Sequence, residues 1–189
     1  MLVAREAARI LAEEGRKDYL VAKMKAAERL GVDSKTALPT NIEVEQALQA
    51  HQMLFQAQTH QPVLKELRMA AVEAMRLFSA FNPRLVGPVL SGVASEHSEV
   101  ALHLFADSAK DVVLFLIEQK IPYDSGEKRY RFGGEYEFIP TLEFVAGDVP
   151  FQLSVFPKDG IRQSPLSPVD GKPMRRANLA EVEGLLFGD

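Results

Sequence analysis

Gly87-Pro-Val-Leu-Ser-Gly92, followed by Ser98-Glu99-Val100-Ala101-Leu102, is the stretch of this chain that says most about its fold. The first segment has the small residues of a turn that leaves a short strand, and the second begins another strand. Because successive side chains of a strand point to opposite faces, the valine and leucines of this strand face a core. The opposite face carries the residues that bear on chemistry: Glu99, Ala101 and His103.

This arrangement resembles the active-site motif of the nucleotidyltransferase superfamily, over roughly residues 68–156. In that family a strand ends in a Gly-Ser turn, the next strand begins Ser-Asp-hydrophobic-Asp, and a later strand carries a third acid. The resemblance implies carboxylates that hold divalent metal ions against the phosphates of a nucleotide. Here Pro88 replaces the serine, Glu99 and Ala101 stand at the two aspartates, and the third position falls on Gln152, or on Ser154 two residues later.

The metal-binding half of the motif is therefore mostly missing. Glu99 is the candidate catalytic residue, and Glu99 and His103 are the candidate metal ligands. Glu143, on the preceding predicted strand, is the only nearby acid that could replace a lost carboxylate. Since a single carboxylate holds Mg²⁺ weakly, we expect no firmly bound cofactor, with Mg²⁺ or Mn²⁺ only if the protein is catalytic, and we do not expect an efficient enzyme.

The phosphate-binding half of the motif is better kept. The turn supplies small residues and backbone amides that could approach a phosphate. A proline-rich tail, residues 158–177, adds five Lys and Arg against two acids. The predicted binding residues for a nucleotide or other phosphorylated ligand are Gly87, Ser91, Gly92, Ser98, Lys172, Arg175 and Arg176. The alternative is that the tail covers a sheet edge and its charges are solvated.

The rest of the chain predicts an α+β protein with a nucleotidyltransferase-like mixed β-sheet and flanking helices, preceded by an N-terminal helical region. Residues 1–82 show helical periodicity, with helices near 3–14, 18–31, 41–55 and 59–81. Asp18 and Asn41 are the predicted caps of the second and third helices. The second helix carries Leu20, Met24, Ala27 and Leu30 on its apolar face.

Residues 83–157 form the predicted α/β core, with strands at 84–90, 99–106, 129–132, 136–146 and 151–156 and a helix at 108–120. That helix has Val112, Leu116 and Ile117 on its apolar side. Pro140 suggests an edge strand or a bulge, because proline cannot donate to a ladder. Residues 158–189 are the tail and a final helix, Leu179 to Phe187, capped by Asn178.

Composition narrows the class of protein further. The 189 residues include no cysteine, which excludes disulfides and thiolate chemistry, and they contain no apolar run long enough to cross a membrane. The start of the chain lacks a secretory apolar segment, so we expect a cytoplasmic protein. The net charge of −4 argues against nucleic acid as a partner.

Three hypotheses follow for the function. The first is a degenerate nucleotidyltransferase-like protein that binds a nucleotide or phosphorylated small molecule without efficient transfer. The second is a non-catalytic module that binds a partner protein, in which Phe151, Phe156 or the tail fills the former cleft. The third is an active metal-dependent nucleotidyltransferase that uses Glu99.

Overall fold

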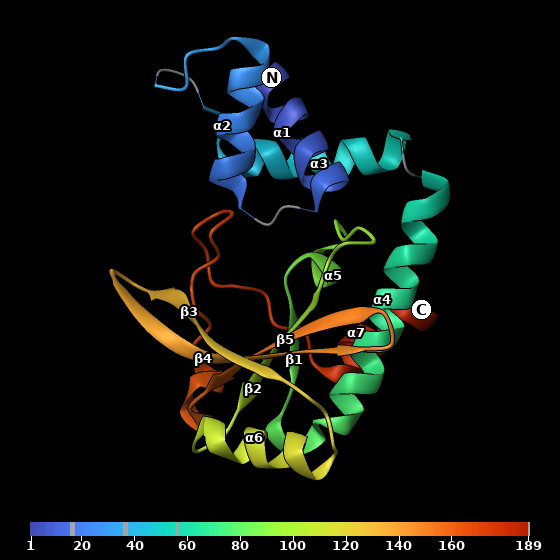
Figure 1. The fold of residues 1–189 in the computed structure, drawn as a ribbon, viewed down its shortest axis with the longest axis vertical. Helices are drawn as coiled ribbons and strands as arrows, with labels where there is room; N and C mark the ends of the chain where they lie inside the picture. Colours follow the sequence, from blue (N-terminus) through green and yellow to red (C-terminus); the bar gives the residue numbers. More distant parts are fainter. Residues whose placement is uncertain (16–17, 36–37, 56, 189) are drawn as a thin grey trace. The chain divides into compact units, whose positions relative to one another are not determined.

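The computed structural model describes residues 1–15, 18–35, 38–55 and 57–188, without the side chains of residues 55–60 (Figure 1). The chain divides into two compact units. The helical unit comprises Met1–Leu64, Gly92–His97 and Pro168–Asp170, and the α/β unit comprises Lys65–Ser91, Ser98–Ser167 and Gly171–Asp189. Each unit is described in turn.

The helical unit contains α1 (Leu2–Glu14), α2 (Tyr19–Leu30), α3 (Asn41–Phe55) and the first turns of α4 (Ala57–Leu77). Local signals set the ends of α1 and α2. Gly15 and Gly31 adopt the left-handed conformation that glycine takes without steric cost, so each ends its helix. The Asp18 carboxylate accepts hydrogen bonds from the amides of Leu20 and Val21, which confirms the predicted cap of α2.

The cap of α3 differs from the sequence prediction. Thr40, and not Asn41, precedes the first turn, and its hydroxyl accepts from the Glu43 amide at 3.2 Å. The Glu43 carboxylate accepts in return from the Thr40 amide at 2.7 Å. This reciprocal capping box satisfies two amides that would otherwise lack partners, whereas the Asn41 amide group donates to the Pro168 carbonyl.

The core of the helical unit consists largely of alanine. α1 packs against both α2 and α3, and α2 buries Ala22, Ala26 and Ala27. The prediction that the larger residues of α2 would form its buried face is wrong, because small side chains line the contact. The three larger residues are 56%, 51% and 41% exposed: Leu20, Met24 and Leu30.

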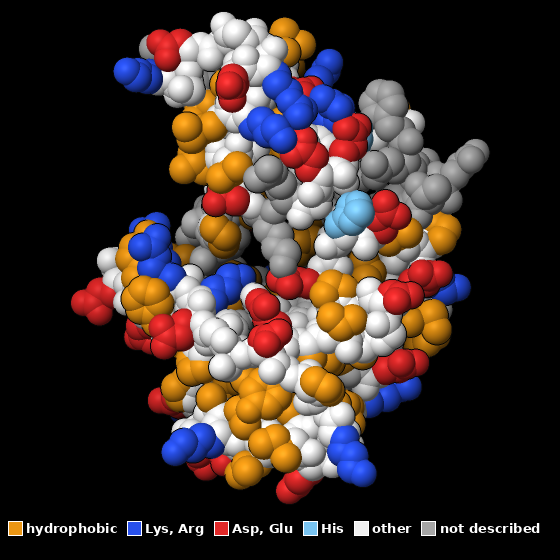
Figure 2. Space-filling model, in the orientation of Figure 1, with side chains coloured by type: hydrophobic (Ala, Val, Ile, Leu, Met, Phe, Trp, Pro, Cys, Tyr) orange, Lys and Arg blue, Asp and Glu red, His pale blue; other side chains and the backbone are white. Residues whose placement is uncertain are grey.

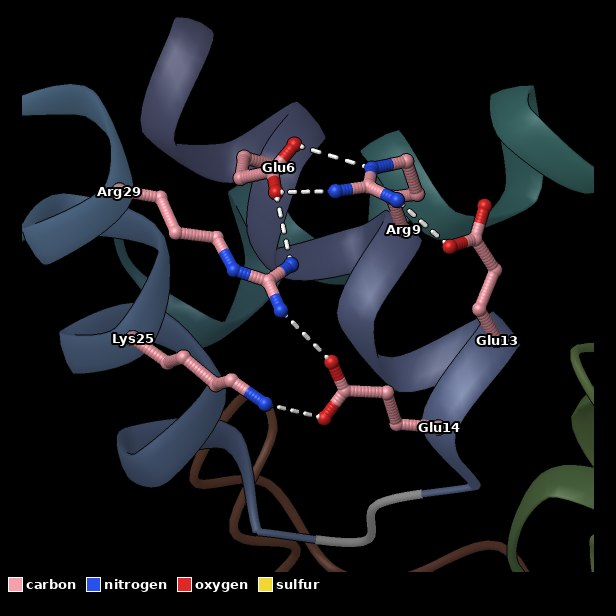
Figure 3. Close-up of polar contacts among 6 residues, drawn as sticks. All are labelled: Glu6, Arg9, Glu13, Glu14, Lys25 and Arg29. Carbon is pink, nitrogen blue, oxygen red and sulfur yellow. Dashed lines mark hydrogen bonds and ion pairs between the residues drawn. The ribbon is translucent and has the colours of Figure 1, made fainter.

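Charged side chains join α1 and α2 at the surface (Figure 3). Arg29 of α2 reaches Glu6 at 3.1 Å and Glu14 at 2.9 Å, and Lys25 reaches Glu14 at 2.5 Å. Arg9 extends the network along α1 to Glu6. Figure 2 shows Lys, Arg, Asp and Glu side chains side by side on the visible face of this unit. Exposed ion pairs contribute little singly, so we assign most of the stability of the unit to its apolar core.

The α/β unit is built on one mixed five-stranded sheet in the order β1-β2-β5-β4-β3. Only β2 and β5 are parallel, and the other neighbours are antiparallel. This confirms the predicted α+β class with a mixed sheet. The strands are β1 (Arg84–Val86), β2 (Val100–Phe105), β3 (Asp124–Phe132), β4 (Glu135–Ala146) and β5 (Val149–Phe156).

Helices and short turns lie before, between and after the strands. They are the later turns of α4, η1 (Ser79–Phe81), α5 (Pro88–Ser91), α6 (Ala109–Glu118), η2 (Lys158–Arg162) and α7 (Leu179–Phe187). The predicted strand 84–90 is shorter than expected. Gly87 has a φ of 76°, which ends β1, and proline favours the first position of a helix, so Pro88 begins α5.

Strand β3 is longer than predicted, because residues 124–128 lack a strand-forming sequence but pair with β4. Pro140 lies where β4 pairs with β3 alone, since pairing with β5 starts at Thr141. The missing amide of Pro140 is therefore tolerated inside a strand that is interior over its second half.

One face of the sheet is covered by helices. Phe78, just after α4, contacts Phe115 of α6 and Phe144 of β4, and Phe144 stacks on Phe151. Ile117 was predicted to lie on the buried side of α6 with Val112 and Leu116; those two are buried, but Ile117 is 57% exposed. Figure 2 shows hydrophobic side chains gathered where Figure 1 places α6.

The tail covers part of the opposite face. Buried residues of four strands gather there, with Ile161 and Met174 of the tail packed against them: Phe105, Tyr130, Ile139 and Phe156. The final helix begins at the predicted cap, where Asn178 and Glu181 form a capping box. Among the described helices, none combines the length and apolarity needed to cross a bilayer.

The burial of α2 can be tested by changing one residue on each side of the helix. Ala26→Leu should lower the free energy of unfolding by about 1–3 kcal/mol, because the fully buried site has no room for the added atoms. Leu20→Ala should change it by less than about 0.5 kcal/mol. Urea unfolding followed by circular dichroism measures both, and a larger loss for Leu20→Ala would contradict the packing described.

Candidate functional site

The candidate site lies on the tail-bearing face of the sheet, where a row of paired residues crosses all five strands. Val86 of β1 pairs with Ala101 of β2, and Ala101 pairs with Gln152 of β5. Gln152 pairs in turn with Glu143 of β4, and Glu143 with Asp124 of β3. Paired residues project to the same face, so these side chains are neighbours. The two positions that the motif assigns to lost carboxylates, Ala101 and Gln152, therefore lie side by side.

The Gln152 side chain makes one hydrogen bond to an acidic residue and one to a basic residue. Its amide nitrogen donates to Glu143 Oε1 at 3.0 Å, and its amide oxygen accepts from Lys128 Nζ at 3.4 Å. Sequence alone could not give the register of Glu143. The structure places its carboxylate beside the Gln152 amide.

Glu99 precedes β2 directly and is half-buried. Its side chain shares the face of Ala101 by strand alternation, two residues away. Among the residues that the structure describes, no group of three or more His, Cys, Asp and Glu side chains could hold a metal ion. Pairing puts Glu143 next to Gln152 and Asp124 of β3 next to Glu143, so this face carries these two acids besides Glu99.

The turn after β1 lies against the same row. A Cβ atom added at Gly87 would lie 3.8 Å from the Ala101 Cβ, so the turn and the strand are in close approach. The amides of Leu90 and Ser91 both donate to the Gly87 carbonyl, at 3.1 and 3.0 Å. The expectation that these amides are available to a phosphate is therefore wrong, because they close the first turn of α5.

The other predicted binding residues are divided between the two units. Ser98 and Ser91 belong to the α/β unit, whereas Gly92 belongs to the helical unit. The Ser91 hydroxyl lies 3.4 Å from the Pro88 carbonyl. Lys172 is exposed, and its carbonyl accepts from the Ser167 amide at 2.7 Å in a tight loop of the tail.

Arg176 of the tail is tied into the sheet. Ala177 next to it pairs with Leu85 of β1 through two backbone hydrogen bonds of 2.8 and 3.0 Å. The Arg176 guanidinium lies over the rings of Phe105 and Phe156, at 5.0 and 4.9 Å from their centroids. Its Nη1 donates to the Gly160 carbonyl at 2.8 Å. Arg176 therefore anchors the tail, and its buried Nη2 has no hydrogen-bond partner among the described residues.

A chain of buried polar groups starts at Arg176. Its Nε donates to His103 Nδ1 at 3.0 Å, and His103 Nε2 lies 3.3 Å from the Tyr130 hydroxyl, which lies 2.8 Å from Ser154 Oγ. Arginine only donates, so Nδ1 must be the unprotonated nitrogen of a neutral imidazole. Nε2 then donates to Tyr130, and Tyr130 donates to Ser154.

The electrostatics agree with this assignment. Burial, followed by the charges of Arg176 and Lys128, holds the pKa of His103 well below its usual range. Burial raises the pKa of Tyr130 to about 12 and lowers the pKa of Arg176 to about 10. With both ring nitrogens engaged inside the protein, His103 has no lone pair for the metal role predicted from sequence while these bonds hold.

One arginine of the site was missed by sequence reasoning. Arg68 of α4 donates from Nε to the Val89 carbonyl and from Nη2 to the Leu90 carbonyl, both at 3.0 Å. The available signal was its position on the apolar stripe of α4, one residue after the buried Leu67 and four after the buried Leu64. A cation at such a position usually has a specific acceptor.

Acidification tests the protonation state of His103. The unfolded chain takes up a proton near pH 6.5, whereas the folded chain does so only at lower pH, so stability falls as pH decreases below about 6.5. The loss should approach about 1.4 kcal/mol per pH unit more in the natural chain than in His103→Gln, in which the amide offers one acceptor and one donor but does not titrate. Urea unfolding at pH 7.5 and pH 5 measures the difference, and equal losses would show that His103 titrates normally.

The polar chain can be tested at its centre. Tyr130→Phe leaves the His103 N–H and the Ser154 hydroxyl without their shared partner, which should cost about 1–3 kcal/mol in the free energy of unfolding. Tyr136→Phe removes the same hydroxyl from a side chain that is 55% exposed, so it should cost less than about 0.5 kcal/mol. Thermal or urea unfolding of both variants compares them, and equal effects would remove the chain's structural role.

Comparison of the chain with family models, with curated proteins and with solved structures finds no match. The site is therefore interpreted from its own residues.

Proposed function

We propose that the α/β unit is a degenerate nucleotidyltransferase-like domain that binds a nucleotide or another phosphorylated ligand without efficient nucleotidyl transfer. The observation that carries the proposal is the row across the sheet. The motif assigns Ala101 and Gln152 to positions of metal-binding acids, and these residues are cross-strand partners next to the Gly87 turn. Three segments of the motif thus converge on one surface.

Loss of transfer follows from the side chains in that row. Two-metal catalysis needs carboxylates that bridge both ions, and a methyl group and an amide cannot replace them. Glu143 and Asp124 end the row on β4 and β3, and Glu99 lies two residues before Ala101, so a transferase would have to use these acids. Glu143 already accepts from Gln152, which opposes its moving to a metal.

The exposure of the row of paired residues supports the proposal that the unit binds a ligand there. Phe151 faces the helices and stacks on Phe144, with 4.9 Å between ring centroids. Phe156 lies farther along the sheet, 4.6 Å from the His103 ring. The tail likewise packs around His103, while Ala101 and Gln152 stay half-exposed. Neither phenylalanine therefore occupies the surface beside Ala101.

A protein-binding module is the second candidate, and the β3–β4 hairpin favours it. Tyr136 and Phe138 are 55% and 67% exposed, and the Arg129 guanidinium lies 4.4 Å from the Tyr136 ring centroid. Arginine and aromatic residues are frequent at the centres of protein interfaces. This surface lies on the opposite side of the hairpin from Tyr130, so it does not depend on the ligand site.

A nucleotide screen separates these proposals. ATP, GTP, CTP or UTP at about 100 times its Kd should stabilise the folded chain by about 2.7 kcal/mol, which raises the Tm by roughly 5 °C or more. Thermal unfolding with each nucleotide, with and without Mg²⁺, measures this shift. No shift with any of them would favour the protein-binding module.

Two variants give the screen a structural control. Ala101→Leu fills the surface beside Gly87 and should abolish the shift, whereas Ala146→Leu, at the exposed end of β4, should keep it. Incubation with labelled nucleotide and Mg²⁺ or Mn²⁺ should give no label transfer. Transfer that disappears in Glu99→Ala would instead establish an active transferase.

A further inference from the structure

Two arginines from distant segments flank the α5 turn. Arg68 comes from α4 and is held by two hydrogen bonds to the carbonyls of Val89 and Leu90. Both bonds use one side of its guanidinium, so the group is fixed in orientation while its Nη1 makes neither bond. Arg68 is half-buried, which makes its charge costly without a nearby anion.

Arg175 approaches the same turn from the tail. Ala177 pairs with Leu85 in the antiparallel direction. The residues that precede Ala177 therefore lie toward the residues that follow Leu85. Arg175 therefore lies on the Gly87 side of this single bridged pair. Its side chain is exposed, and its charge adds to burial in lowering the pKa of Arg68, so the two cations lie within electrostatic range.

Neither guanidinium has a carboxylate partner within the described part of the chain. Like charges brought together repel, and arginine forks bind phosphate oxygens with two parallel hydrogen bonds. The amides of the turn close α5 internally, so side chains must supply the donors for an anion here. The geometry around the turn therefore matches a phosphate group better than an uncharged ligand.

We propose that Arg68 and Arg175 form an anion subsite that holds a phosphate group of the ligand and replaces the metal ions of a nucleotidyltransferase as the source of positive charge. This inference rests on the proposed function. It adds a chemical requirement: the ligand binds through phosphate in the absence of metal. Because Mg²⁺ neutralises part of the charge of a nucleotide, the free nucleotide should bind at least as tightly as its Mg²⁺ complex.

Calorimetric titration of the full chain tests the subsite with three probes in EDTA: ATP, inorganic pyrophosphate and adenosine. ATP and pyrophosphate should bind, and adenosine should bind at least 10-fold more weakly than ATP. Arg175→Gln should weaken pyrophosphate binding by about 10- to 100-fold, the loss expected for hydrogen bonds to a charged group. Arg162→Gln removes the same charge from another exposed position and should leave the affinity unchanged.

Arg175 is exposed, and its side chain makes no hydrogen bond to another described residue, so its variant should retain the Tm of the natural chain. Binding of ATP that is unchanged in Arg175→Gln, or that requires Mg²⁺, would overturn the subsite and leave the proposed function standing. Absence of binding by ATP and by pyrophosphate in the natural chain, with and without Mg²⁺, would overturn both.

Discussion

Parallel pairing of β2 with β5 at the centre of the sheet is the constraint on which the α/β unit depends. Six consecutive pairs fix the register, from Val100 with Phe151 to Phe105 with Phe156. Side chains that alternate between the faces then divide the unit. Leu102 and Leu153 enter the helix-covered core, and His103 and Ser154 enter the face that the tail covers. A shift of one residue in the pairing of either strand would exchange its side chains between the helix-covered core and the tail-covered face.

The tail divides one face of the sheet into a covered region and a half-exposed region. Arg176 places a cation over two neighbouring aromatic rings and donates to a neutral His103, and this holds the tail over the end of β2 and β5. The region around Ala101 and Gln152 stays half-exposed. Arg176 therefore acts as an anchor, whereas its neighbour Arg175 is exposed and is the residue that the proposal assigns to the ligand.

Under the proposed function, the absence of the motif's metal ligands and the presence of arginines near the turn have a common physical explanation. A phosphate group needs compensating positive charge in its site, which metal ions or guanidinium groups can supply. With Ala101 and Gln152 in the row, metal ions have few ligands. In the proposal, Arg68 and Arg175 offer the alternative source of positive charge, so that binding is retained without metal-activated chemistry.

The sequence by itself determined the features that depend on contacts within a few residues. Gly15 and Gly31 end their helices, and Asp18 and Asn178 begin theirs, because each signal and its hydrogen-bond partner lie within a single turn. Strand alternation likewise separated Ala101 from its buried neighbours, and helical and strand periodicity gave the α+β class. The Asn41 cap was misassigned because its neighbour Thr40 also has a capping side chain.

Only the tertiary structure decided which residues meet. Glu143 and Gln152 pair through a hairpin register, Arg68 reaches carbonyls 21 and 22 residues away, and Arg176 reaches His103 across 73 residues. Nothing in the local sequence specifies such partners, since they depend on how whole elements pack. The same reason explains α2, where close approach of the helices selected Ala26 for the core and left Leu20 at the surface.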